Sequence, residues 1–160
     1  MSPGGFTIVE LAISLAIIAT LTAIALPLTQ DYLYKANVAR SSTEIRGLEK
    51  EIIFFKTERG RYPGWPMLDS LQEIGRDTFL DPWGTPYQYL NLELAVADSE
   101  GKPKDCRKDR SRNPLNEDFD LYSVGPDRIL PTHRQITQES GADDIVRAAS
   151  GAYVGEGSKY

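Results

Sequence analysis

The first thirty residues contain an apolar run that is long enough to cross a membrane and that holds a single charge. Residues 6–28 are 23 consecutive residues in which Glu10 is the only charged side chain. As a helix they would extend about 34 Å, against about 30 Å for the hydrocarbon core of a bilayer. Residues 31–160 carry 18 basic and 22 acidic side chains, a net charge of −4. The sequence therefore joins an apolar N-terminal segment to one polar, mildly acidic domain.

Several interpretations of the apolar run compete. A cleaved signal peptide would fit the small residues at Ala23–Ala25, but no basic residue precedes the run and Pro27 follows the candidate cleavage site closely. A plain membrane anchor leaves Glu10 unexplained, because a carboxylate at the bilayer centre costs about 2.5–3.5 kcal/mol. Glu10 could lie in the headgroup region, where the N-terminus of a helix favours an anion. Alternatively, it could pair with a cation of another chain.

The residues around Glu10 resemble a known processing site. The run Gly5-Phe6-Thr7-Ile8-Val9-Glu10 is similar to that of the superfamily of type IV pilins and type II secretion pseudopilins. The resemblance implies that a prepilin peptidase removes residues 1–5 as a leader and methylates the new N-terminal Phe6. It implies that Glu10 pairs with the N-terminal ammonium of a neighbouring subunit, a pairing that lowers the cost of both charges in a membrane. Pro27 matches the position of a helix-bending proline in this superfamily.

The helix is expected to continue well beyond the membrane segment. Ile45, Leu48, Ile52 and Phe55 are spaced by three, four and three residues, which places them on one helical face. Gly60 is expected to end the helix. A helix over residues 6–59 would be about 80 Å long. Its first half should therefore project beyond the domain of residues 29–160, while its second half buries the apolar face.

Turn formers and short β-prone segments follow the helix. Asp81-Pro82-Trp83-Gly84-Thr85-Pro86 predicts a turn that leads into a strand at residues 87–90, and residues 119–124 predict a second strand by their alternation. We expect Trp83 to pack against the helix. The Asp-Pro-Trp-Gly run is also similar to one in the major pseudopilins. The predicted fold is therefore α+β and pilin-like, with a long N-terminal helix on a small antiparallel sheet and a long C-terminal loop.

Residues 102–112 form a basic loop between the two predicted strands. The loop contains six basic and two acidic side chains, and it also contains Cys106. The interpretation as a solvated loop competes with a contact to an acidic face of another subunit. Nucleic acid is not expected, because no aromatic residues alternate with the charges and the chain is acidic overall. Cys106 is the only cysteine, so it is a free thiol or forms an intermolecular bridge.

Two acidic clusters flank the C-terminal loop. Ser123-Val124-Gly125-Pro126-Asp127 and Gly141-Ala142-Asp143-Asp144-Ile145 resemble the calcium loop of major pseudopilins. The resemblance implies that Asp127 and Asp144, with Asp143 as a spare, bind a calcium ion together with backbone carbonyls of residues 121–124. The alternative is that Asp127 caps a turn and Asp143 caps a short helix over residues 144–149.

No catalytic arrangement is evident. The single histidine, His133, and the single cysteine cannot supply a closed zinc site, and no phosphate-binding glycine loop is present. We therefore expect a protein that is not an enzyme.

The resemblance implies a function in a filament. We expect a subunit of a helical pseudopilus of a type II secretion system that acts as a piston or scaffold for protein export. The implied partners are other copies of the chain, minor pseudopilins, prepilin peptidase, an inner-membrane assembly platform and the secreted proteins. The chain would cross the bacterial inner membrane once, with its C-terminal domain in the periplasm. A type IV pilus subunit, or a membrane-anchored binding module that stays monomeric, remain as alternatives.

Overall fold

The computed structural model describes residues 5–64, 67, 69–97, 99, 101–111, 113–130, 135–136 and 141–160. Arg112 and His133 lie outside these residues. The chain forms two compact units, Met1–Ala36 and Asn37–Tyr160. One helix, α1 (Ile8–Arg59), supplies most of the first unit and begins the second.

The long helix is confirmed almost to the residue. It contains 52 residues, and at its C-terminal end Gly60 adopts a φ of 74°. The Gly60 N–H donates to the Lys56 carbonyl over 2.8 Å, which closes the last turn. Glycine adopts this left-handed conformation without the strain that a Cβ would cause, so Gly60 ends the helix as its sequence position predicts.

The N-terminal unit has no buried side chain among its described residues. Every residue from Gly5 to Leu33 is exposed, including large apolar residues such as Ile17 and Leu21. This part of α1 is long and apolar enough to cross a membrane. The predicted boundaries at residues 5 and 28 concern processing and membrane insertion, and they stay predictions.

The C-terminal unit contains the hydrophobic core. Three of the four residues of the predicted helical face, Ile45, Leu48 and Ile52, are at most 3% exposed, and Phe55 is half-buried. They pack against the aromatic and aliphatic side chains of the sheet, among them Tyr89, Phe119 and Leu121. As predicted, Trp83 packs against this cluster.

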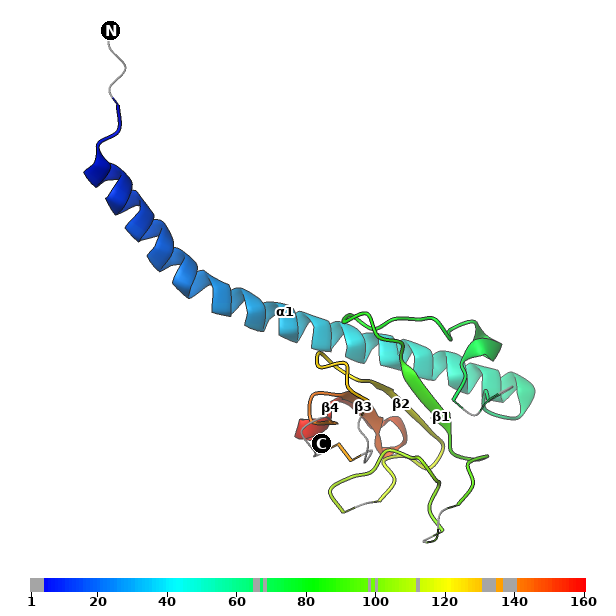
Figure 1. Cartoon of the computed structure of the whole chain (residues 1–160). Helices are drawn as coiled ribbons and strands as arrows, with labels where there is room; N and C mark the ends of the chain where they lie inside the picture. The colour runs from blue at the N-terminus through cyan, green and yellow to red at the C-terminus, as the bar shows by residue number, and fades with distance from the viewer. Residues whose placement is uncertain are drawn as a thin grey trace. The chain divides into compact units, whose positions relative to one another are not determined.

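The sheet has four antiparallel strands in the order of the sequence. They are β1 (Gln88–Asn91), β2 (Phe119–Ser123), β3 (Ile145–Ala148) and β4 (Tyr153–Glu156). Figure 1 shows these strands side by side along the C-terminal half of α1. The expected α+β fold, with one long helix on a small antiparallel sheet, is therefore confirmed.

The alternation predicted for the second strand does not describe its burial. All five residues of β2 are buried. Phe119 and Leu121 belong to the cluster beneath α1, whereas Tyr122 joins a second cluster that includes Leu115, Val124, Ile136 and Val146. Both faces of β2 are covered, because a second apolar layer lies on the side of the sheet opposite the helix.

The C-terminal part of the chain holds more sheet than the sequence suggested. Residues 145–148 form β3, so the short helix proposed in the capping alternative for residues 144–149 is wrong. Ile145 and Val146 are β-branched and pair with Ser123 and Tyr122 of β2. The strand is only four residues long, and its long-range pairing partner leaves no local pattern that would predict it.

Candidate functional site

The predicted processing site lies just before the helix. Gly5 and Phe6 are both exposed, Phe6 by 77%, and α1 begins at Ile8. The junction between Gly5 and Phe6 is therefore in non-helical, accessible chain. Whether it is cleaved and methylated stays a prediction.

Glu10 lies in the first turn of α1, three residues after Thr7. The Glu10 N–H donates to Thr7 Oγ1 over 3.2 Å, so the threonine caps the helix. Thr7-Ile8-Val9-Glu10 has the spacing of a capping box, a signal that our interpretation of the sequence missed. The carboxylate also lies at the helix end where the dipole favours an anion. Glu10 thus has a local structural reason for its position, and its role in assembly stays a prediction.

The other polar side chains of the apolar run are satisfied within the helix. Three hydroxyl groups of the run, those of Ser14, Thr20 and Thr22, donate to backbone carbonyls three or four residues earlier over 2.7–2.8 Å. Thr29, just after the run, does the same over 2.8 Å. A hydroxyl bonded in this way is compatible with hydrocarbon surroundings. The carboxylate of Glu10 is therefore the group in this run for which a membrane is most costly.

The helix continues through Pro27 without interruption. Proline has no N–H, so the helix lacks one hydrogen bond to the carbonyl four residues earlier, that of Ala23. Pro27 is thus a weak point in a helix that is otherwise continuous. A bend or extension at this residue during assembly stays a prediction.

Asp81 organises the turn before β1. Its Oδ1 accepts hydrogen bonds from the N–H groups of Trp83 and Thr85 over 3.0 and 2.8 Å, and its Oδ2 accepts one from the Ser123 hydroxyl over 2.5 Å. Asp81 is only 4% exposed. The Asp-Pro-Trp-Gly run therefore has a structural role, since it joins the turn to β2.

Each of the three carboxylates of the acidic loop contacts a partner, and the contacts of Asp127 and Asp143 lie within the loop. The Asp127 N–H donates to Asp143 Oδ2 over 3.3 Å, and Asp127 Oδ1 accepts from the Ile129 N–H over 2.8 Å. Gly125 has a φ of 69°, and a Cβ there would collide with the carbonyl oxygen of Asp143. Asp127 therefore stabilises its own turn, as the capping alternative predicted, and the two acidic clusters lie next to each other.

Asp144 is fully buried and forms an ion pair with Arg107. Burial raises the pKa of Asp144, the Arg107 guanidinium opposes that rise, and the charges of Asp143 and Asp127 add to it. Burial and the charge of Asp127 also raise the pKa of Asp143. The three predicted calcium ligands thus interact electrostatically, and an arginine that sequence reasoning did not assign to this site lies among them.

The described residues offer few side-chain ligands for calcium. They include no group of three or more carboxylate, thiol or imidazole ligands close enough to hold a metal ion. Within the same residues, Asp143 Oδ1 and Asp144 Oδ1 are buried without a hydrogen-bond partner. Calcium binding therefore stays a prediction, for which these two oxygens are the available ligands.

The basic loop is less uniformly exposed than its charge suggested. Arg107 is 1% exposed, whereas Lys104 and Arg110 are exposed. Cys106 is fully buried and is not part of a disulfide. Its burial in this unit argues against a bridge to another chain.

A second buried arginine joins helix and sheet. Arg147 on β3 donates to Glu49 of α1 over 2.7 Å and forms two bonds of 2.8 Å with Asp118. Its guanidinium carbon lies 4.0 Å from the centroid of the Phe119 ring. Arg147 therefore fixes the helix against the sheet, and no pattern in the sequence marked it.

An open cavity of about 290 Å³ lies among residues between the end of α1 and the start of β1. It is lined by Met67, Leu71 and Tyr87, with Asp69 and Asp77 among its polar residues. These groups include no nucleophile paired with a base. The cavity gives no support to a catalytic role.

Comparison with known proteins identifies two groups of relatives. The chain is 25% identical to type II secretion system core protein G of Pectobacterium carotovorum over 148 residues, covering 82% of this chain and 81% of that protein. It is 26% identical to the protein of the same name from Pseudomonas aeruginosa, covering 77% and 83% of the two chains. It is also 37% identical to a fimbrial protein of Neisseria meningitidis over 60 residues.

The two groups match over different lengths. The alignment with the Neisseria fimbrial protein covers 38% of this chain and about a third, 35%, of that relative. No family profile matches the chain, and no solved structure is significantly similar to it.

Proposed function

The chain belongs to the superfamily of type IV pilins and type II secretion pseudopilins, and we propose that it is a subunit of the pseudopilus of a type II protein secretion system. The length of the matches supports this choice within the superfamily. Both core proteins G align with more than three quarters of the chain, whereas the fimbrial protein aligns over 60 residues. In the pseudopilus the subunit would serve as part of a piston or scaffold for the export of folded proteins.

Assembly would use the exposed half of α1. Every residue from Gly5 to Leu33 is exposed in the single chain, and most are apolar. In the membrane this surface is already out of water, so association would be driven by close packing of these helices and by polar contacts between them, rather than by removal of apolar surface from water. Pro27, with its missing N–H, is the residue at which the helix would extend to fit the filament.

Glu10 would select the register of this packing. Cleavage between Gly5 and Phe6 creates an ammonium on Phe6, which is then methylated. An unpaired carboxylate is costly in hydrocarbon, and pairing it with this ammonium on the neighbouring subunit reduces the cost for both groups. A neighbour displaced along the filament would leave both charges unpaired, so only one register is favourable.

The proposed function implies a location and a set of partners. The subunit would be held in the bacterial inner membrane by α1, with its C-terminal unit in the periplasm. Its partners would be prepilin peptidase, the inner-membrane assembly platform, minor pseudopilins and the secreted proteins.

A subunit of a type IV pilus is the second candidate. The specific observation in its favour is the higher identity of the fimbrial relatives, 50% over 48 residues for the protein of Moraxella nonliquefaciens. Deletion of the chain in its host separates the two. Loss of exoprotein release with surface fibres intact supports the pseudopilus, and the reverse result assigns the chain to a pilus.

Mass spectrometry of the mature N-terminus tests the processing. The expected product, from cells that express prepilin peptidase, begins at Phe6 and carries one methyl group on its amine. An intact Met1, or a cleavage after Ala25 as in a signal peptide, would contradict both filament functions.

Substitutions in the first turn separate the charge of Glu10 from its place in the capping box. Glu10→Gln keeps a side chain suited to this position of the box but removes the charge, and we expect it to abolish filaments seen by electron microscopy. Thr7→Ala removes the cap and keeps the charge, and it should still assemble. Filaments of the Gln variant would show that assembly does not need the charge of Glu10 and would leave this residue a purely structural role. Absence of filaments from the wild-type chain as well would support a monomeric anchor.

A further inference from the structure

Arg107 occupies a position in the core that an arginine rarely takes. Its side chain is 2% exposed, and the side chain of Asp144, its ion-pair partner, is 0% exposed. Transfer of two such charges from water costs several kcal/mol each unless they are paired. A buried guanidinium therefore has to be matched to a buried anion, and here that anion is one of the predicted calcium ligands.

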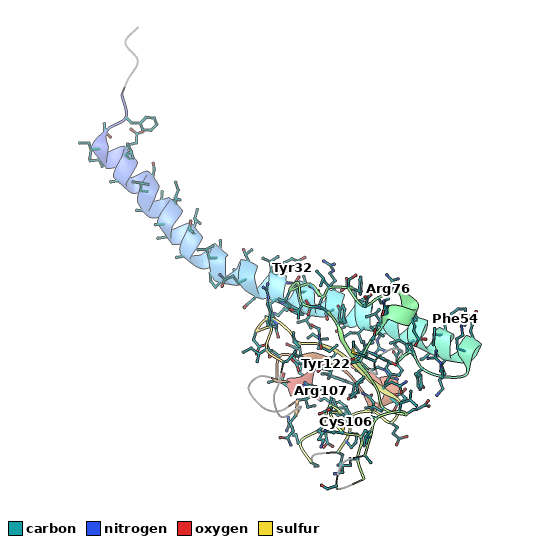
Figure 2. All side chains as sticks on the ribbon, turned by 45° about the vertical axis from the view of Figure 1, so that its right-hand side comes forward. Tyr32, Phe54, Arg76, Cys106, Arg107 and Tyr122 are labelled. Carbon is teal, nitrogen blue, oxygen red and sulfur yellow. The ribbon has the colours of Figure 1, made fainter. Side chains whose placement is uncertain are left out.

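Several segments that are distant in the sequence meet at Arg107. Its backbone N–H donates to Asp120 Oδ2 of β2 over 2.5 Å, and its carbonyl accepts from the Leu115 N–H over 2.9 Å. Its guanidinium carbon lies 4.5 Å from the centroid of the Tyr122 ring, and Figure 2 shows these two side chains next to each other. Through the ion pair it also contacts the segment that precedes β3.

That segment is in turn joined to the end of the chain. The Asp144 carbonyl accepts from the Gly157 N–H over 2.8 Å, and the Ala142 carbonyl accepts from the Ser158 N–H over 2.9 Å. The Arg107–Asp144 pair thus connects the basic loop, β2, the end of the acidic loop and the C-terminal residues. A divalent ion that closed the acidic loop would make the same kind of connection, since it too would bind Asp144 and draw the loop ends together.

We propose that the guanidinium of Arg107 is the cation that closes the C-terminal acidic loop, in place of a bound divalent ion. The side chain of Asp144 has one buried oxygen on Arg107, and its other oxygen has no partner among the described residues. Asp143 Oδ1 is also buried and has no hydrogen-bond partner among the described residues. Removal of the guanidinium would leave Asp143 and Asp144 as adjacent carboxylates without a cation, which is the chemistry that binds calcium. Arg107 would close the loop whether or not the chain polymerises.

Thermal unfolding of the full chain in detergent micelles, followed by tryptophan fluorescence, tests this role. The Tm of the wild-type protein should be the same in calcium chloride and in chelator. Arg107→Gln should lower the Tm in chelator by on the order of 10 °C, because it leaves a buried carboxylate unpaired. Calcium should then raise the Tm of this variant by on the order of 5 °C. Arg110→Gln, an exposed arginine of the same loop, is the matched control and should behave as wild type.

Two further variants keep the test decisive if Arg107→Gln does not fold. Arg107→Lys retains the charge and should remain insensitive to calcium. The double variant Arg107→Gln with Asp144→Asn removes both buried charges and should recover part of the lost Tm without gaining calcium sensitivity. The proposal would be overturned if the Tm of the wild-type protein fell in chelator and returned with calcium. It would also be overturned if Arg107→Gln had the same Tm as the wild-type protein.

Discussion

The two units of the chain place their apolar side chains in opposite environments. In Met1–Ala36 the large aliphatic residues are exposed, and Ile18 is 59% accessible. In Asn37–Tyr160 the helical face that carries Ile45, Leu48 and Ile52 is buried, and Ile52 is 0% accessible. The same helical pattern therefore serves two purposes, because the second unit supplies its own sheet to cover the helix, and the first has to find its cover in a membrane or in other copies.

The units also differ in whether their charged side chains have partners within the chain. The described part of the first unit has one carboxylate, Glu10, within its apolar run. The second unit buries the Arg107–Asp144 pair completely, and it buries Arg147 against the partly buried Glu49 and Asp118. A charge that is partnered inside its own chain stabilises that chain, whereas a charge that lacks such a partner favours association with another.

The largest expected effect on the second unit comes from Arg147→Leu. The substitution leaves Glu49 and Asp118 without their cation next to the core, and we expect it to lower the free energy of unfolding by about 3–5 kcal/mol. Chemical denaturation of the chain in detergent measures this. Arg46→Leu on the exposed face of the same helix should change stability by no more than about 0.5 kcal/mol. If the two variants lower the free energy of unfolding equally, a buried arginine contributes no more to stability than an exposed one.

A matched pair of isoleucine substitutions compares the two units directly. Ile52→Ala creates a cavity in the core and should cost about 2–5 kcal/mol of stability. Ile18→Ala removes the same atoms from an exposed site of the first unit and should leave the unfolding of the second unit unchanged. It should reduce the yield of filaments instead. A large loss of stability from Ile18→Ala would show that the first unit is covered within the single chain.

Asp81→Ala tests the turn that precedes β1 and is hydrogen-bonded to β2. It removes the acceptor of two backbone N–H groups and of the Ser123 hydroxyl, so we expect a loss of about 1–3 kcal/mol. Asp69→Ala, an exposed acidic residue before the turn, is the control. If both variants unfold at the same denaturant concentration as wild type, Asp81 does not organise the turn.

The smallest predicted effect concerns pH. Burial alone would raise the pKa of Asp118, but its bonds to Arg147 and the Phe119 N–H outweigh this and hold the pKa below 3.8. Since the folded state favours the ionised carboxylate, its stabilising contribution is present above the unfolded pKa and is lost as the pH falls through the folded value.

Melting curves between about pH 5 and about pH 3 check this contribution. Asp118→Asn should have a lower Tm than wild type at the upper pH, by on the order of 5 °C. Its Tm should fall less steeply with acid, so that the two curves converge. A parallel fall of both curves would assign the acid sensitivity to other carboxylates.

Much of the fold was accessible from local sequence signals. The spacing of Ile45, Leu48 and Ile52 predicted both the helix and its buried face, and Gly60 predicted its end. The strand β1 was predicted from the turn before it, and β2 was predicted from its alternation. Both predictions agree with the observed bounds to within about one residue. The strands β3 and β4 were missed, because β3 pairs with β2 across the acidic loop and β4 pairs with β3, and neither pairing leaves a local pattern in the sequence.

The candidate sites were predictable to different degrees. Gly5, Phe6, Glu10 and Pro27 form a local motif, and so they could be named without a fold. Asp127, Asp143 and Asp144 were named through the resemblance of their segments to the calcium loop of major pseudopilins, but their partners in the fold were not predicted. Arg107 is one of six basic residues in a loop that is otherwise hydrophilic, and nothing in the loop distinguishes a buried arginine from an exposed one.

The sequence by itself determined the long helix, the apolar surface of its first half and the isolated carboxylate within it, because these properties depend on residues close together in the chain. Only the tertiary structure decided which charges of the second unit are internal. Arg107 meets Asp144 and Arg147 meets Glu49 across 37 and 98 residues of sequence. Such pairs form where the sheet and the helix bring distant segments together, and the free energy of burying them depends on that geometry rather than on composition.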